Sequence, residues 1–167
     1  MRVTLIRHAE AGDDAPRDEA RALTARGRQD ARRLGQALAR RGVEFSVMVT
    51  SPLVRAVQTA EIVAAELGYR ERIGVTELLV PEGTASQVVV FLRSFLRSTG
   101  RQLEGTPSIA LVAHEPILSA VAAALIGRAR HPPLRKTEAL RIRIGNDPEE
   151  KGILRWRVDA RGRREQL

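Results

Sequence analysis

Short apolar runs alternate along this chain with longer stretches in which apolar and polar residues recur at helical spacing. The apolar runs have the length of strands and predict buried strands at residues 3–6, 45–50, 73–75 and 109–113. Apolar and polar residues then alternate at 140–144 and 153–158, which predicts an antiparallel hairpin. The sequence Gly-Asn-Asp-Pro at 145–148 is expected to form its turn.

The amphipathic stretches predict four helices, at residues 24–41, 51–67, 84–96 and 116–126. Thr24 is expected to cap the first helix, and Ser51 followed by Pro52 the second. Thr84 and Gln87 have the spacing of a capping box at the third. Glycine follows three of these helices, at Gly42, Gly68 and Gly127, where it stops a helix easily. The polar stretch 10–21 is expected to be a loop.

Strands and helices in alternation predict an α/β fold, a three-layer sandwich with a mostly parallel central sheet between helices. The antiparallel C-terminal hairpin is expected at its edge. The chain has no internal repeat and no linker-like stretch, so we expect residues 1–167 to form one domain. It carries no signal-like segment and no apolar run near the roughly 18 residues of a membrane span, which predicts a soluble cytoplasmic protein without membrane contact.

Composition narrows the possible chemistry. The chain has no cysteine, so disulfides, thiolate metal sites and cysteine nucleophiles are excluded. Its net charge of +8 would suit a polyanion. The cations are scattered among 20 acidic residues, however, and only three Phe, one Tyr and one Trp could stack on bases, so nucleic acid is not expected to be the partner. The basic stretch 155–164 remains a candidate surface for a polyanionic partner.

Candidate chemistry gathers where the predicted strands end. Arg7 and His8 follow the strand at 3–6, Arg55 lies just past the strand at 45–50, and His114 follows the strand at 109–113. In an open parallel sheet the ligand crevice lies outside the carboxyl ends of the strands, so these four side chains are expected to meet. Arg55 is in the first turn of a helix, where a cation is unfavourable unless an anion shares the place. His131 follows no strand and is expected to be structural.

Metal and serine chemistry fit these residues poorly. His8-Ala9-Glu10 imitates the His-x-Glu of zinc deaminases, but their Pro-Cys-x-x-Cys partner is absent. His8, Glu10, His114 and Glu115 could in principle bind a divalent ion, although the two arginines would oppose it. No metal or other cofactor is therefore expected. Ser51 lacks a Gly-x-Ser-x-Gly setting, and it is interpreted as a helix cap.

A phosphoryl group suits the set better. Its charged oxygens match arginine forks, and a neutral imidazole held in line can attack phosphorus. Arg7 and Arg55 are expected to lower the pKa of His8 and keep its ring neutral. His114 would then donate to the charge that develops on the phosphoryl oxygens.

The chain resembles the histidine phosphatase superfamily, also called phosphoglycerate-mutase-like, and within it the short SixA-type phosphohistidine phosphatases. The resemblance covers at least residues 1–126 and rests on an ordered set of motifs. They are Leu5-Ile6-Arg7-His8-Ala9-Glu10-Ala11, Arg21-Ala22-Leu23-Thr24-Ala25-Arg26-Gly27, Thr50-Ser51-Pro52-Leu53-Val54-Arg55-Ala56-Val57-Gln58-Thr59-Ala60, Glu77-Leu78 and Leu111-Val112-Ala113-His114-Glu115-Pro116.

The resemblance implies that His8 is the phosphorylated nucleophile, that Arg7 and Arg55 clamp the phosphate, and that His114 is the second pocket histidine. Arg21 is a further candidate for phosphate contact. Ala9 stands where the family signature has glycine, and the long insertions that build a cap in mutases and acid phosphatases are missing. The resemblance therefore implies an open site that suits a protein substrate.

Two carboxylates are candidates for the general acid. Glu115 follows His114 where acid phosphatases of the superfamily place an acidic residue, and Glu77 matches the region that mutases use. The expected activity is that of a metal-independent phosphatase acting through phospho-His8, and the expected partner is a phosphorylated protein such as a phosphohistidine-bearing signalling domain. A small-molecule phosphomonoesterase and a phosphate-binding module without turnover remain as alternatives.

Overall fold

A seven-stranded sheet forms the centre of the computed structural model, which describes residues 1–99, 106–145, 147 and 150–166. The strand order is β3-β2-β4-β1-β5-β6-β7. The first four of these strands in space run parallel, and their bounds are β3 (Gly74–Val75), β2 (Val47–Thr50), β4 (Ser108–Ala113) and β1 (Arg2–Arg7). The remaining three add antiparallel, as β5 (Glu138–Arg143), β6 (Ile153–Asp159) and β7 (Arg164–Gln166).

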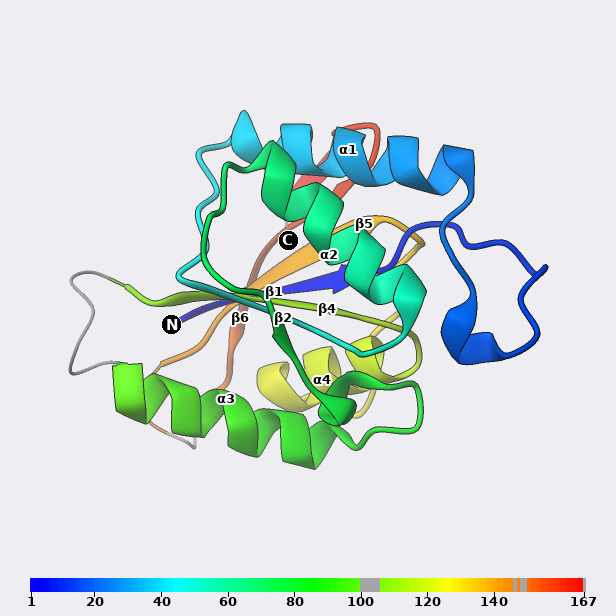
Figure 1. The fold of residues 1–167 in the computed structure, drawn as a ribbon. Helices are drawn as coiled ribbons and strands as arrows, with labels where there is room; N and C mark the ends of the chain where they lie inside the picture. The colour runs from blue at the N-terminus through cyan, green and yellow to red at the C-terminus, as the bar shows by residue number, and fades with distance from the viewer. Residues whose placement is uncertain (100–105, 146, 148–149, 167) are drawn as a thin grey trace.

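Helices cover both faces of the sheet and complete the three layers (Figure 1). Helices α1 (Ala25–Ala39) and α2 (Val54–Glu66) pack on one face, and α3 (Ala85–Thr99) and α4 (Ile117–Ile126) on the other. The α/β sandwich expected from the sequence is confirmed, with the predicted hairpin as β5 and β6. The turn expected at 145–148 includes Asn146 and Pro148, which lie outside the described residues.

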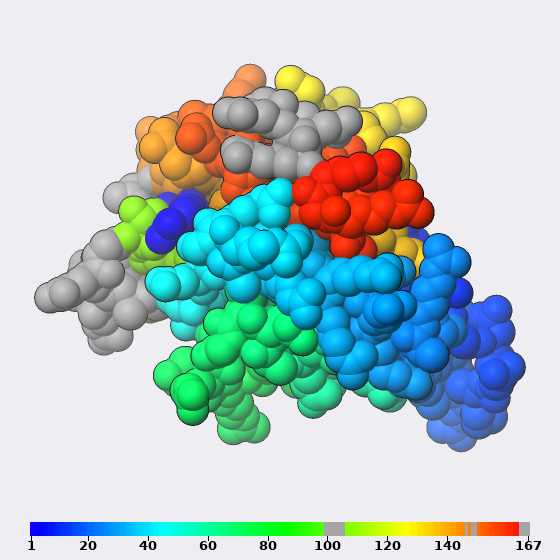
Figure 2. All heavy atoms as spheres, turned by 90° about the horizontal axis from the view of Figure 1, so that it is seen from above, coloured from blue at the N-terminus to red at the C-terminus, as the bar shows by residue number. Residues whose placement is uncertain are grey.

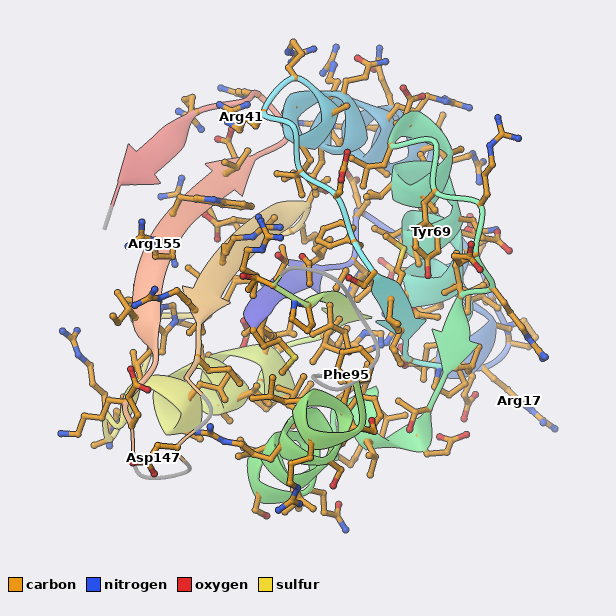
Figure 3. The ribbon with its side chains drawn as sticks, turned by 90° about the vertical axis from the view of Figure 1, so that its left-hand side faces the viewer. Arg17, Arg41, Tyr69, Phe95, Asp147 and Arg155 are labelled. Atoms are coloured by element: carbon orange, nitrogen blue, oxygen red, sulfur yellow. The ribbon has the colours of Figure 1, made fainter. Side chains whose placement is uncertain are left out.

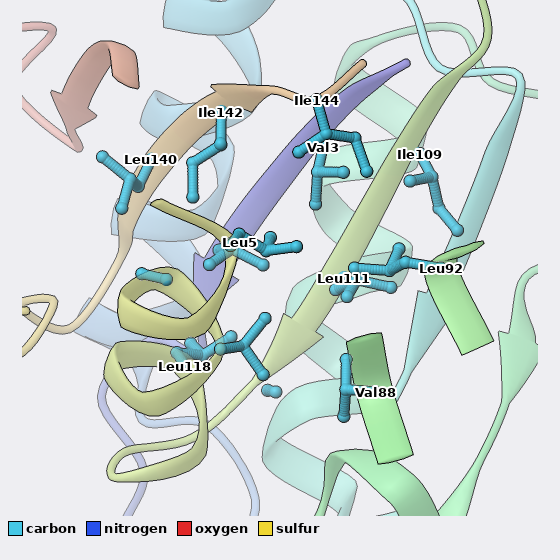
Figure 4. Packing of buried hydrophobic residues seen from close by; sticks show 14 of the residues in the cluster. Val3, Leu5, Val88, Leu92, Ile109, Leu111, Leu118, Leu140, Ile142 and Ile144 are labelled. Atoms are coloured by element: carbon cyan, nitrogen blue, oxygen red, sulfur yellow. The ribbon is translucent and has the colours of Figure 1, made fainter. Parts of the chain in front are cut away.

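The core explains why the central strands are apolar throughout. Along β4, Ile109 and Leu111 pack towards α3 and α4, whereas Ala110 and Val112 pack towards α1 and α2. Figure 4 shows the first of these clusters, in which Leu5 of β1 lies close to Leu111 and Leu118. A strand covered on both faces needs an apolar side chain at every position, which a continuous apolar run supplies.

The structure differs from the sequence predictions in several details. The stretch 10–21, expected to be a loop, contains the short 3-10 helix η1 (Asp18–Ala20). The second helix begins at Val54 with Leu53 as its N-cap residue, so Ser51 does not cap it. Ser51 instead continues the pairing of β2 with β4, because its N–H donates to the carbonyl of Val112 at 3.1 Å. Strand β7 was not predicted, since its three residues carry no apolar alternation and depend on pairing with β6. In the part of the chain that the structure describes, no helix is long and apolar enough to cross a membrane.

Candidate active site

The carboxyl ends of β1, β2 and β4 bring the predicted histidines together. His8 directly follows β1, and its N–H continues the sheet by donating to the carbonyl of Ala113 at 3.0 Å. His114 directly follows β4. The centroids of the two imidazole rings are 4.9 Å apart, with an angle of 50° between their planes. Both rings are buried, since His8 is 8% exposed and His114 is 2% exposed.

The hydrogen bond of His8 determines which of its nitrogens is free. Nδ1 lies 2.7 Å from the carbonyl oxygen of Ala9, and because a carbonyl only accepts, Nδ1 carries the proton. Nε2 then keeps its lone pair. Burial is the main cause that lowers the pKa of His8 to about 4, and the charges of Arg55 and Arg7 lower it further. The expected direction of this shift is confirmed, although burial contributes more than the arginines.

His114 is held by a residue whose role the sequence did not reveal. Its Nε2 lies 2.9 Å from Oγ of Ser51, which is fully buried. Its Nδ1 is buried too, and has no hydrogen-bond partner among the described residues. Burial, followed by the nearby His8, lowers the pKa of His114 to about 3, so this ring is neutral as well.

Two arginines stand beside the histidines, as the sequence predicted. Arg7 donates from Nη1 to the carbonyl of Leu134 at 2.7 Å. Arg55, in the first turn of α2, donates to the carbonyl of Asp18 at 2.7 Å and to its carboxylate at 2.8 Å. Both arginines are close enough to lower the pKa of each histidine. The Asp18 carboxylate shows that an anion can pair with the Arg55 fork.

Arg21 lies three residues after Asp18 and donates to the same carboxylate as Arg55 does. Its guanidinium donates to the carbonyl of Gly12 at 2.8 Å and to the Asp18 carboxylate at 3.0 Å, and it pairs with Asp13. The hydrogen bonds from Arg55 and Arg21 hold the pKa of Asp18 below its usual value. In this conformation Arg21 is connected to the clamp through Asp18 and makes no direct bond to the histidines.

The two candidate acids occupy different places. Glu115 accepts from the N–H of Leu134 at 2.7 Å and from the N–H and hydroxyl of Ser119 at 3.2 Å and 2.6 Å. One carboxylate oxygen of Glu115 is therefore hydrogen-bonded to Leu134 and the other to Ser119 of α4. Glu77 lines a cavity of about 460 Å³ next to the clamp, together with Asp18, Glu19, Pro52, Leu53, Val80, Pro81 and Glu82.

Two threonines hydrogen-bond the backbone around His8, a role that the sequence analysis did not predict. The hydroxyl of Thr59 accepts from the N–H of Ala9 at 3.1 Å and donates to the carbonyl of Arg55 at 2.7 Å. It therefore links the residue after His8 to α2, the helix that carries Arg55. Its spacing of four residues from Arg55 could have placed it on the same helix face. Thr137 has a left-handed φ of 58° and donates from its N–H to the carbonyl of His8 at 3.3 Å.

Other sequence candidates lie outside this set. His131 is half-buried, and its Nδ1 bonds the carbonyl of Pro132 at 2.7 Å. Within the described residues, no three His, Asp or Glu side chains come together in a way that could hold a metal ion. The site is therefore built from two neutral imidazoles and two guanidinium groups. Such a set offers one nucleophilic nitrogen and several donors to a bound dianion.

Comparison with known proteins agrees with this arrangement. Residues 3–80 match the histidine phosphatase superfamily (branch 1). The chain is 28% identical to phosphohistidine phosphatase SixA of Escherichia coli, over 95% of this chain and 93% of that protein. It is 33% identical to an uncharacterized protein of Picosynechococcus sp., over 87% and 86% of the two chains. A solved structure of the protein histidine phosphatase SixA with tungstate superposes with a TM-score of 0.86 at 25% identity, covering 96% of this chain and 97% of that one.

Proposed function

The chain belongs to the histidine phosphatase superfamily, and we propose that it forms a phosphohistidine intermediate on His8 and removes phosphoryl groups from phosphohistidine in proteins. The observation that carries the proposal is the bond from Nδ1 of His8 to the carbonyl of Ala9. It leaves the lone pair of Nε2 free in a neutral ring beside Arg55 and Arg7. A nucleophile needs that state, because a protonated imidazole has no lone pair to give.

The reaction would proceed in two displacements. Nε2 of His8 attacks phosphorus, the bond from phosphorus to the substrate nitrogen breaks, and the leaving imidazole takes up a proton. Water then attacks phospho-His8, which releases inorganic phosphate and restores the free ring. Arg7 and Arg55 bind the phosphoryl oxygens, with the Arg55 fork exchanging the Asp18 carboxylate for the substrate. No resident metal is needed in this scheme, since the arginines supply the positive charge.

What the site offers to the leaving group supports phosphohistidine as the substrate. Glu115 is engaged with Leu134 and Ser119, and Glu77 lies on the wall of the neighbouring cavity, so neither bonds the histidines. Imidazole leaves readily without a strong acid, whereas a sugar or serine alkoxide requires one. The similarity to SixA over nearly the whole chain supports a protein substrate as well.

The cavity beside the clamp favours one alternative. With a volume of about 460 Å³ and Glu77 on its wall, it could hold the carrier of a small phosphomonoester and protonate its oxygen. Values of kcat/KM for a panel of substrates distinguish the phosphohistidine phosphatase from the small-molecule phosphomonoesterase. We expect phosphohistidine and activated aryl phosphates to exceed sugar phosphates and phosphoserine. A sugar phosphate ranked first, with Glu77→Gln slowing it strongly, would favour the small-molecule reading.

The covalent step has its own test. After rapid quench without acid, label from a phosphorylated substrate should be found on His8, and His8→Ala should abolish turnover. Activity should survive chelators and be inhibited by tungstate, which resembles the transferring phosphoryl group. Binding of phosphate without turnover would make the protein a phosphate-binding module, and label on another residue would overturn the mechanism.

A further inference from the structure

We propose that Ser51 is a positioning residue that keeps the proton of His114 on Nδ1 and so makes Nδ1–H the atom that donates to the phosphoryl group. This inference rests on the proposed function, because it names the donor in that reaction. It also replaces the helix-capping role expected for Ser51. Its basis is the hydrogen-bond arrangement around one buried hydroxyl.

The surroundings of Ser51 limit where its proton can go. The residue is fully buried, and its Oγ lies 2.9 Å from Nε2 of His114. The same Oγ accepts from the N–H of Leu53 at 3.3 Å. A serine hydroxyl has one proton and two lone pairs. The Leu53 N–H uses one lone pair. Nε2 of His114 therefore either donates to the remaining lone pair or accepts the hydroxyl proton.

Only one of these two arrangements satisfies the hydroxyl. If Nε2 of His114 were the donor, Ser51 would accept twice and its own proton would need another acceptor. Among the described residues, the hydroxyl forms hydrogen bonds with His114 and Leu53 alone. A buried hydroxyl proton without an acceptor is costly, so the hydroxyl donates to Nε2. Because the His114 ring is neutral, its single proton then lies on Nδ1.

The orphaned Nδ1 of His114 fits this assignment. It is buried and has no partner among the described residues, as expected of a donor whose acceptor arrives with the substrate. The two rings, 4.9 Å apart, are then held in the same Nδ1–H tautomer, but a different nitrogen is left free in each, Nε2 in His8 and Nδ1 in His114. The Ala9 carbonyl leaves His8 with a free lone pair, and Ser51 leaves His114 with a free N–H. One ring can attack phosphorus while the other stabilises its oxygens.

The first test reads the tautomer directly in the free wild-type protein. Nitrogen-15 spectra that use the long-range couplings of the imidazole ring show which nitrogen carries the proton. We expect Nδ1–H for both His8 and His114. A proton on Nε2 of His114 would overturn the proposal. Since this measurement needs no turnover, its outcome is independent of whether phosphohistidine is the substrate.

The second test separates positioning from packing. Ser51→Ala should lower kcat by about 10- to 100-fold with KM changed by less than about threefold, since the lost donor acts mainly in the transition state. It should also leave His114 as a mixture of tautomers. The matched control is Thr50→Val, which removes an adjacent buried hydroxyl that donates to the carbonyls of Ser51 and Val112. Its kcat should stay near the wild-type value.

Coupling to His114 completes the design. In a His114→Ala background, Ser51→Ala should cause no further loss, because Ser51 acts only through that ring. Ser51→Thr retains the hydroxyl and should recover most of kcat. An additional full loss in the His114→Ala background, or Ser51→Ala with wild-type kcat, would contradict the proposal. If Ser51→Ala fails to fold, the wild-type tautomer still decides.

Discussion

Arg55 shows how a single residue can be both buried and available. Its side chain is 6% exposed, yet its partner in the free protein is the carboxylate of Asp18, in the short 3-10 helix Asp18–Ala20 at the surface. An anion that binds more tightly than this carboxylate can take its place on the fork. Burial thus strengthens the clamp without closing it to a substrate.

We expect Arg55→Ala to lower kcat/KM by about 30- to 1000-fold, which corresponds to roughly 2–4 kcal/mol of lost transition-state stabilisation. The cause is the loss of a charge-assisted fork from a largely dry pocket. Steady-state kinetics with a phosphohistidine substrate would measure it. Arg26→Ala is the control, because Arg26 is exposed on α1 and its nearest carboxylates are 3.8 Å and 3.9 Å away. An Arg55→Ala enzyme within threefold of wild type would show that Arg55 does not bind the phosphoryl group.

The two buried histidines should also make stability depend on pH. Their folded pKa values are about 4 for His8 and about 3 for His114, whereas an unfolded histidine titrates near 6.5. Below pH 6.5 the unfolded chain binds protons that the folded chain refuses, so the free energy of unfolding falls as pH drops from 6.5 towards 4.

The magnitude for His8 is on the order of 2–3 kcal/mol at pH 4. Chemical denaturation across this range would measure it. His8→Gln should lose less stability than the wild type on acidification. Because both proteins have the same carboxylates, the contribution of carboxylate protonation cancels in the difference between their free energies of unfolding. Parallel curves for the two proteins would contradict a buried, neutral His8.

At the scale of elements, α1 and the loop after His8 are fitted to one another. A Cβ on Gly27 would lie 2.0 Å from the backbone oxygen of Glu10, so the first turn of α1 touches the chain two residues after His8. The N–H of Thr24 donates to the same oxygen at 3.0 Å. The glycine therefore sets the path of the loop that starts at the nucleophile.

Gly27→Ala should destabilise the protein by about 1–3 kcal/mol, because the methyl group would have to displace backbone. It should also reduce kcat, since the displaced loop carries His8 at one end. Gly12→Ala is the matched control in that loop, where the nearest atom to a new Cβ is 3.9 Å away. Thermal denaturation and kinetics of both variants test this, and equal effects of the two would count against the close fit.

The elements also show why some features were predictable from the sequence and others were not. The Thr24 cap was predicted and is confirmed, because its hydroxyl accepts from Gly27 three residues on, a purely local contact. Ser51 was misread as a cap because its partner, His114, lies 63 residues away. The pairing of Asp18 with Arg55 spans 37 residues and had no local signal either. The ends of the strands could be predicted from the apolar runs. Side-chain partners that lie far apart in the sequence could not, because they depend on how the strands and helices assemble.

At the scale of the molecule, three arginines line one hollow of the surface. Arg33 of α1 and Arg40, which directly follows that helix, are exposed, and they line a hollow of about 260 Å³ together with Arg161 from the turn after β6. Arg41 joins the two elements by donating to the carbonyl of Gly162 at 2.8 Å. Figure 2 shows this last part of the chain against α1, and Figure 3 places Arg41 and Arg155 at the same outer side.

This distribution of charge predicts how salt affects the encounter with a folded substrate. With a net charge of +8, the protein should attract an acidic phosphohistidine-bearing domain, and kcat/KM should fall roughly tenfold as salt is raised from low to physiological concentration. The value of kcat should change little, because chemistry follows binding. Replacing Arg33 and Arg40 by Glu should reduce both kcat/KM and its salt dependence for that domain, while an aryl phosphate is turned over as before. A steep salt dependence that survives this double replacement would assign the steering to another surface, and no salt dependence would mean that the charge does not guide the substrate.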